Sequence, residues 1–233
     1  GTASPSNYHS NGDNFVIYQT GAPTGMTIVS DTDQAGNIMF ADGTSGADAY
    51  RGFIHYAHGD NHMQFATDGS ERMRITSAGN VGIGNTALGG AATTGDNNIA
   101  IGASAGDAIT SGKDNVFMGK DAGGAATTGD WNIAIGGSTF GAALTGDFNI
   151  AIGQAAGDAV TSGDENVLIG HDAGTALVDG DNNVCIGGSA NNNATSDQNS
   201  IHIGYNSKGS TPNDGVSNEI NLGVNLVGGG AEV

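Results

Sequence analysis

The feature that most constrains this chain is a five-residue pattern that returns every 17 residues. The pattern reads Asn, then Ile or Val, then any residue, then Ile or Met, then Gly. Its intact copies begin at Asn98, Asn115, Asn132, Asn149, Asn166 and Asn183. Related copies begin at Asn80, Ser200 and, in degenerate form, Glu219. A short fixed period is typical of a solenoid, in which each repeat forms one coil and buries its apolar side chains against its neighbours.

One unit, NIAIGQAAGDAVTSGDE from Asn149 to Glu165, illustrates the expected coil. Alternation of large apolar residues in its first segment indicates a strand. Glycine at the fifth and fifteenth positions predicts two turns, because glycine enters left-handed backbone conformations cheaply. The Ala-x-Thr segment at positions eleven to thirteen predicts a second, weaker strand. Each unit is therefore expected to run strand, turn, strand, turn.

Stacking of such coils places equivalent residues in columns. We expect the second and fourth positions to line the interior, in the columns Ile99, Val116, Ile133, Ile150, Val167, Val184 and Ile101, Met118, Ile135, Ile152, Ile169, Ile186. The asparagines are expected to hydrogen-bond from coil to coil, as amides do in stacked β-structure. The third position is apolar as well, in Ala100, Phe117, Ala134, Ala151, Leu168 and Cys185. An exposed strand face is normally polar, so we expect other copies of the chain to cover this face; small residues tolerated on an exposed face are the alternative.

The first 79 residues have a different texture. Short apolar segments separated by turn residues predict a β-meander with strands at 26–29, 37–40, 51–56, 62–66 and 72–76. Residues 1–13 are polar and expected to be poorly ordered. The predicted organisation is therefore a meander over 1–79, a parallel β-solenoid or β-roll over 80–223, and a tail over 224–233.

Composition excludes several classes of protein. The formal net charge of −18 comes from 24 acidic residues against 6 Lys and Arg, so nucleic acid is not an expected partner. No apolar run approaches the roughly 20 residues that span a bilayer, and membrane insertion is not expected. Cys185 is the single cysteine, which excludes an intrachain disulfide.

At this point the sequence resembles a known family. The stretch GTSGADAYRGFIHYAHGDNHMQFATDGSERMRITSAGNVGIGNT, from Gly43 to Thr86, resembles the shaft-to-repeat junction of phage tail fibres, particularly marine ones. The 17-residue NIAIGxxAGxAxTxGD units are similar to repeats of those proteins and, more distantly, to the heads of trimeric autotransporter adhesins. Such fibres often carry a carboxy-terminal intramolecular chaperone domain, which this sequence does not include, so no catalytic residue is carried over.

The resemblance implies an all-β homotrimer located in the virion tail fibre, outside the cell. Its implied partners are other copies of the chain, other virion fibre proteins, and a glycan or protein of the host surface. We therefore expect a structural and host-attachment protein without enzymatic activity.

Two aromatic residues are the main binding candidates. Trp131 and Phe148 occupy the seventeenth position of consecutive coils, where polar residues such as Asp114 and Glu165 stand elsewhere. The pattern predicts exposed rings about 5 Å apart that stack against a sugar. Phe140, in place of a glycine at the ninth position, is a third candidate. Shielding of the coil junction and packing on a neighbouring subunit are the alternatives.

Metal sites have weaker support. The turn carboxylates Asp130, Asp147, Asp164 and Asp181 form a column that calcium could neutralise, although Asp also favours turns by bonding local amides. His55, His58 and His62 cluster in YAHGDNH and could ligate a metal around a threefold axis. Proximity across a turn explains them equally well. His202 is a lone further candidate. No cofactor is expected, with calcium the single exception considered.

Alternative functions remain open at this stage. A tailspike-like enzyme that degrades polysaccharide needs two carboxylates about 5–9 Å apart, whereas the acids here follow the repeat. An ice-binding solenoid is suggested by the column Thr94, Thr128 and Thr145, but Ser111, Ser162 and Asp179 interrupt it. A cell-surface adhesin solenoid is the last alternative.

Overall fold

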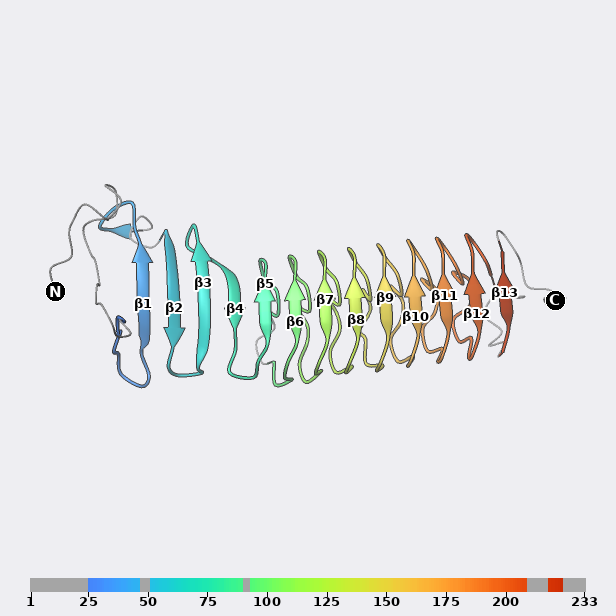
Figure 1. Ribbon diagram of the computed structural model, residues 1–233, viewed down its shortest axis with the longest axis horizontal. Helices are drawn as coiled ribbons and strands as arrows, with labels where there is room; N and C mark the ends of the chain where they lie inside the picture. Colours follow the sequence, from blue (N-terminus) through green and yellow to red (C-terminus); the bar gives the residue numbers. More distant parts are fainter. Residues whose placement is uncertain (1–24, 47–50, 90–92, 209–217, 224–233) are drawn as a thin grey trace, which may run out of the picture.

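The computed structural model describes residues 25–46, 51–89, 93–208 and 218–223. The molecule is an elongated all-β rod in which thirteen strands form one sheet, in sequence order from β1 to β13 (Figure 1). The predicted tail at 224–233 and the polar segment 1–13 lie outside the described residues. Within the described part of the chain, no helix has the length and apolar character needed to cross a membrane.

Four antiparallel strands come first. They are β1 (Ala35–Phe40), β2 (Gly52–Ala57), β3 (His62–Thr67) and β4 (Ser70–Ile75). Each pairs with the next, and β4 pairs antiparallel with β5 (Val81–Ile83). These strands lie close to four of the five segments predicted from the sequence. The fifth prediction was wrong, because residues 26–29 form no strand.

From β5 onward the strands are parallel, three residues long, and one coil apart. They are β6 (Ile99–Ile101), β7 (Val116–Met118), β8 (Ile133–Ile135), β9 (Ile150–Ile152), β10 (Val167–Ile169), β11 (Val184–Ile186), β12 (Ile201–Ile203) and β13 (Ile220–Leu222). Their register pairs equivalent residues of successive repeats, as in Ala151 with Leu168. The predicted parallel β-solenoid is confirmed.

The predicted second strand of each coil is absent from the described coils. Its segment is joined from coil to coil by separate backbone bonds, such as those that Thr110 N–H donates to Thr127 O and Thr161 N–H to Val178 O. Glycine-rich turns lie on both sides of this segment. Glycine weakens a strand, so the segment does not form a continuous β-ladder with the next coil.

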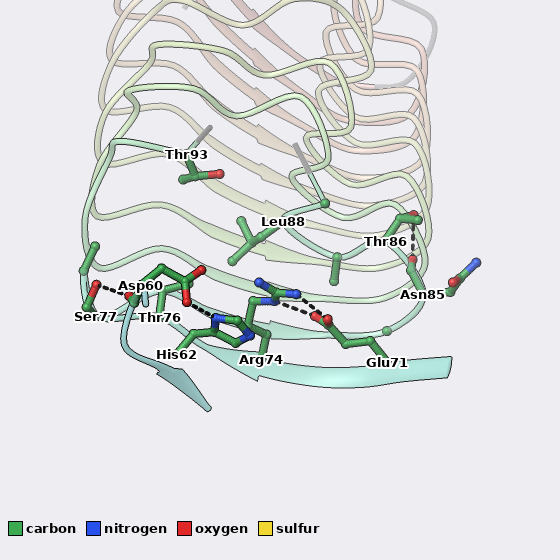
Figure 2. A pocket seen from close by; sticks show the side chains of 14 residues that line it. Asp60, His62, Glu71, Arg74, Thr76, Ser77, Asn85, Thr86, Leu88 and Thr93 are labelled. Atoms are coloured by element: carbon green, nitrogen blue, oxygen red, sulfur yellow. Dashed lines mark hydrogen bonds and ion pairs between the residues drawn. The ribbon is translucent and has the colours of Figure 1, made fainter. Parts of the chain in front are cut away.

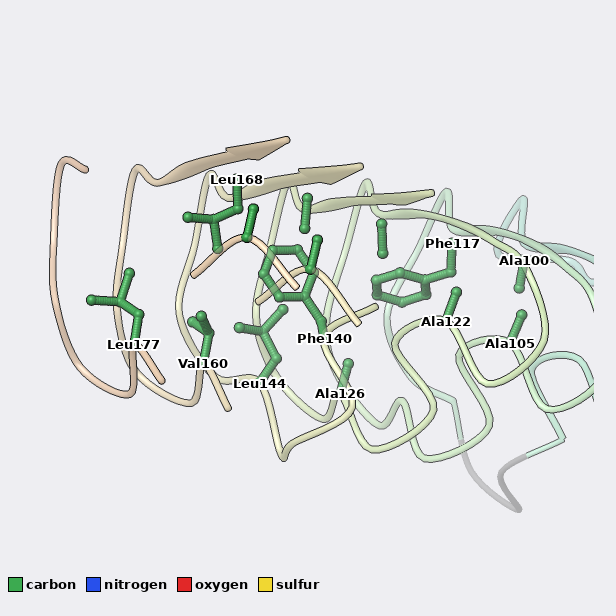
Figure 3. Close-up of a cluster of buried hydrophobic side chains, with 14 of the residues drawn as sticks. Ala100, Ala105, Phe117, Ala122, Ala126, Phe140, Leu144, Val160, Leu168 and Leu177 are labelled. Atoms are coloured by element: carbon green, nitrogen blue, oxygen red, sulfur yellow. The ribbon is translucent and has the colours of Figure 1, made fainter. Parts of the chain in front are cut away.

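The third position of each strand faces the interior, and the prediction of its orientation was wrong. Ala100, Phe117, Ala134, Ala151, Leu168 and Cys185 are all 0% exposed. They belong to one core cluster with buried residues of the opposite wall such as Leu144, Val160 and Leu177 (Figure 3). The second and fourth positions therefore point outward. The narrow coil has room for one column of strand side chains, in which the large Phe117 and Leu168 stand opposite glycine; two columns of Ile and Val would overfill it.

The core is filled from either of two positions in a coil. Where the third position is Phe117 or Leu168, the ninth position is glycine, and a Cβ added at Gly123 or Gly174 would overlap that side chain. Where the third position is Ala134, the ninth is Phe140, which is fully buried. Each of these coils thus carries one large side chain, which keeps the packing density of the core.

The predicted asparagine column is confirmed. Asn149 is fully buried; its Nδ2 donates to Oδ1 of Asn132 at 3.1 Å and to the carbonyl of Gly163 at 2.7 Å. Its own Oδ1 accepts the backbone N–H of Asn166 at 3.0 Å. The same pattern repeats through the middle coils, so this buried polar column has its hydrogen bonds satisfied.

The two glycine positions have different causes. At the fifth position the backbone has φ near +137°, as at Gly102 and Gly153, a conformation that L side chains rarely adopt. At the fifteenth position, as at Gly146 and Gly163, φ is not positive. A side chain there would instead overlap the carbonyl oxygen of the next coil. The prediction of a left-handed turn at the fifteenth position was wrong; close approach of the coils requires glycine there.

Candidate functional site

An apolar stripe runs along the outside of the whole sheet, from β1 to β13. We call it the outer stripe; it consists of two columns of paired residues. The first column is Gly36, Tyr56, Met63, Ile75, Val81, Ile99, Val116, Ile133, Ile150, Val167, Val184, Ile201 and Ile220. The second is Ile38, Ile54, Phe65, Met73, Ile83, Ile101, Met118, Ile135, Ile152, Ile169, Ile186, Ile203 and Leu222.

The outer stripe is substantially open to solvent. Ile135 and Ile152 are each 37% exposed and Leu222 is 57% exposed. No member of either column carries a charge. Continuous exposed apolar surface of this length marks an interaction site on a protein.

The antiparallel strands have a second face of mixed polarity, with a central column of polar residues. Asn37, His55, Gln64 and Arg74 are paired across β1 to β4, and their column continues into the solenoid interior at Gly82 and Ala100. His55 Nδ1 lies 2.8 Å from Asn37 Oδ1. Met39 and Phe53 lie on this face as well, whereas Ile38, Ile54, Phe65 and Met73 lie on the outer stripe.

Trp131 and Phe148 form a second feature on the surface. Their rings are stacked, with centroids 4.8 Å apart and planes within 6° of parallel. The side chains are 49% and 50% exposed. The predicted spacing and exposure are confirmed. Because parallel rings this close must overlap, they form an offset stack and do not lie side by side as one flat platform.

The backbone at this turn position is left-handed in every described coil. φ is +55° at Trp131 and +59° at Phe148, and it is also positive at Asn97, Asp114 and Glu165. Asn and Asp tolerate this conformation, whereas bulky residues there are outliers. Holding a non-glycine residue in this region costs on the order of 1–3 kcal/mol. Two aromatic residues at this position are therefore not what the turn itself requires.

The neighbouring carboxylates have a structural role. Asp130 Oδ1 accepts the backbone N–H of Lys113 at 2.7 Å, and Asp147 Oδ1 accepts that of Asp130 at 2.7 Å. Asp164 and Asp181 repeat this contact with the preceding coil. Each of the four predicted calcium candidates thus bonds a backbone amide one coil away, as Asp commonly does at turns.

Phe140 does not belong with the two exposed rings. It is fully buried in the core, so its prediction as a ligand-binding residue was wrong (Figure 3). The glycine that it replaces at the ninth position lies against the core, not on the outer turn. Sequence position alone could not separate an inward turn residue from an outward one.

The three clustered histidines have separate surroundings. His55 and His62 lie on neighbouring strands with ring centroids 5.7 Å apart, while His58 packs edge-on against Tyr56. His62 Nδ1 lies 2.6 Å from Asp60 Oδ1, and this hydrogen bond lowers the pKa of Asp60. Among the residues described here, no three His, Cys, Asp or Glu side chains come together as metal ligands do.

A cavity of about 560 Å³ lies where β3 and β4 meet the first coil, a feature that the sequence did not predict (Figure 2). Arg74 crosses this cavity and binds Glu71 through Nε at 2.7 Å and Nη2 at 2.5 Å. That hydrogen bonding raises the pKa of Arg74. The cavity wall therefore carries the Arg74–Glu71 and His62–Asp60 pairs, and Leu88 and Ala87 line it as well.

The interior becomes polar in the last coils. Asp197 replaces the usual glycine of the fifteenth position, and His202 takes the third position; both are buried, with His202 Nε2 3.5 Å from Asp197 Oδ2. That separation is too long for a good hydrogen bond, and both carboxylate oxygens lack a hydrogen-bond partner. Asn221 Nδ2 lies 3.3 Å from His202 Nδ1. Cys185 is also fully buried, and this burial raises the pKa of its thiol to about 12, so the thiol is protonated at neutral pH.

Comparison of the chain with protein-family models, with curated proteins and with solved structures gives no match.

Proposed function

We propose that this chain is a structural and host-attachment segment of a homotrimeric fibre, of the kind found in virion tail fibres, and that it has no enzymatic activity. The outer stripe carries this proposal. The interface assigned to the third position from the sequence is replaced by the second and fourth positions, which are apolar and exposed.

The four antiparallel strands supply the strongest reason for a partner. A sheet must bury one face against another layer to be stable. In β1 to β4 the face that continues the solenoid interior is mixed: it carries Asn37, His55, Gln64 and Arg74 beside Met39 and Phe53. The outer stripe carries only apolar or uncharged residues, among them Ile54, Phe65 and Met73. The apolar face therefore needs a cover that the described part of the chain does not provide.

The extent of the outer stripe suits a permanent assembly. Thirteen strands at about 4.8 Å spacing give a stripe roughly 58 Å long. A standard interface buries about 800 Å² per partner, and the partly exposed Ile, Val, Met and Leu side chains of the stripe extend along this whole length.

Copies of the same chain are the fitting occupant. The two columns of the stripe run unbroken through the antiparallel and the parallel strands. Copies of the chain aligned in parallel around an axis along the rod can therefore bring equivalent stripe residues together in every layer. Cyclic symmetry of this kind is common in homo-oligomers. The number three follows from the resemblance to tail fibres, and the long rod fits a fibre segment that holds a binding surface away from the particle.

Sedimentation equilibrium of the full chain tests the proposal. The parent is expected to be a trimer at micromolar concentration. Ile135→Asp together with Ile152→Asp is expected to give folded monomers, because buried unpaired carboxylates in an interface cost several kcal/mol each. Gln154→Asp with Asn182→Asp, which adds the same two charges per chain at exposed turn positions, is the matched control and should remain trimeric. A monomeric parent, or a trimeric double variant, would refute the interface.

A further inference from the structure

We infer that Trp131 and Phe148 form a saccharide-binding site that takes uncharged or amino-bearing sugars and rejects anionic ones. This inference deepens the attachment role proposed above and rests on it for its biological purpose. It does not depend on assembly for its chemistry, because both rings belong to adjacent coils of one chain.

The stacked rings leave two aromatic faces free. Each ring covers only one face of the other, since their planes lie within 6° of parallel. The free face of Trp131 is turned toward the coil of Asp114, and that of Phe148 toward the coil of Glu165. A pyranose ring packs its C–H groups on such a face, and the half-exposed side chains leave room for it.

Backbone strain points to a role beyond folding. The left-handed turn position is filled by Asn97, Asn182, Asn199 and Asn218 in other coils, all with positive φ. Asparagine tolerates this conformation better than bulky residues do, so Trp131 and Phe148 are held there against the local preference. Strained residues of this kind cluster at ligand sites. Core packing does not account for them, because both side chains face solvent.

The charges around the rings select the ligand. Asp114 and Glu165 are exposed and occupy the same turn position one coil beyond each ring. Carboxylates accept hydrogen bonds from sugar hydroxyls and attract an ammonium group, but they repel a uronate or a sulfate. The whole chain carries a net charge of −18, which adds to that repulsion. Asp114 and Glu165 lie three coils apart, roughly 14 Å, so a ligand that contacts both carboxylates is a short oligosaccharide and not one sugar.

Intrinsic fluorescence reports directly on this site, because Trp131 is the single tryptophan of the chain. Titration of the full chain with glucosamine oligomers and with neutral gluco-oligosaccharides is expected to give a saturable change in emission. Oligogalacturonate at the same concentrations is expected to give none. Phe148→Asn keeps the reporter and should weaken binding at least about tenfold, by analogy with the loss of one stacked ring.

Thermal melting separates binding from packing. Trp131→Asn with Phe148→Asn should melt at or above the parent temperature and lose glycan-array binding, because asparagine suits the left-handed turn. Asn182→Asp, at the same turn position of another coil, is the control and should bind like the parent. Glu165→Gln with Asp114→Asn should reduce the preference for amino sugars over neutral ones.

Two results would overturn the inference. One is the absence of a saturable response to any neutral or amino-bearing saccharide; the other is a double asparagine variant that melts clearly below the parent. The monomeric Ile135→Asp, Ile152→Asp variant should keep the fluorescence response. If the parent proves monomeric and still responds, the fibre proposal fails and the saccharide site stands.

Discussion

Buried polar side chains behave differently in the middle of the solenoid and in its last coils. Asn132, Asn149 and Asn166 satisfy one another and the adjacent backbone, so a polar column is stable in the core. Asp197 and His202 lie equally deep, yet the carboxylate oxygens and His202 Nε2 have no hydrogen-bond partner. Burial of a polar group without a hydrogen-bond partner lowers stability. The loss is larger when only the carboxylate is buried than when the carboxylate and the imidazole are buried together.

The Asp197–His202 pair gives a residue-scale prediction. His202→Leu is expected to lower the free energy of unfolding by about 3–5 kcal/mol, because it strands a buried carboxylate. Adding Asp197→Gly, the residue found at this position in earlier coils, should restore the parent stability or exceed it by about 1–4 kcal/mol. Urea denaturation of the parent and both variants measures this. Equal stability of the single and double variants would show that Asp197 has a partner in solution.

At the scale of the coil, the core is specified by volume more than by position. Phe117 enters from the strand opposite Gly123, while one coil later Phe140 enters from the turn opposite Ala134. Both arrangements fill the same narrow interior. The large core side chain can therefore come from the strand in one coil and from the turn in the next, with the same backbone path in both.

This exchange predicts a compensating pair of substitutions. Phe140→Gly should lower the free energy of unfolding by about 3–5 kcal/mol through the cavity that it leaves. Ala134→Phe should lower it by about 1–3 kcal/mol or more through overpacking. Together they reproduce the arrangement of Phe117 with Gly123, and the double variant should lie within about 1 kcal/mol of the parent. Chemical denaturation of all four proteins gives the coupling energy; simple additivity would show that the two sites fill separate spaces.

At the scale of the whole molecule, apolar attraction along the outer stripe opposes charge repulsion. Three copies with a net charge of −18 each carry 3 × −18 = −54 in total, and no charged residue lies in the stripe. Raising the ionic strength from about 0.01 M to about 0.15 M shortens the Debye length from about 30 Å to about 8 Å. Salt should therefore weaken the repulsion and leave the apolar contact intact.

We accordingly expect the trimer to tighten with salt over this range. Sedimentation equilibrium at several sodium chloride concentrations should show a falling dissociation constant, and the melting temperature should rise with protein concentration at each salt level. An assembly that loosens as salt is added would mean that ion pairs hold the subunits, which the uncharged stripe does not provide.

The sequence by itself determined the solenoid, its coil length, its buried asparagine column and the exposed aromatic pair. A 17-residue period fixes which residues become neighbours in successive coils, whatever the inside of the coil is. Asn132 therefore had to lie beside Asn149, and Trp131 beside Phe148. Nearest-neighbour stacking is a local rule, and periodicity is enough to apply it.

Only the tertiary structure decided which strand face is inside. Ile150, Ala151 and Ile152 are all apolar. The alternation of side chains along a strand therefore divides them between two faces, but it does not say which face is the core. The width of the closed coil settles this: the interior accepts one column of strand side chains, in which Phe117 and Leu168 stand opposite glycine, and it has no room for the two columns of Ile and Val. The same closure buried Phe140, exposed Trp131 and placed the Arg74–Glu71 pair in the cavity below the first coil, because each depends on contacts between segments that no single repeat contains.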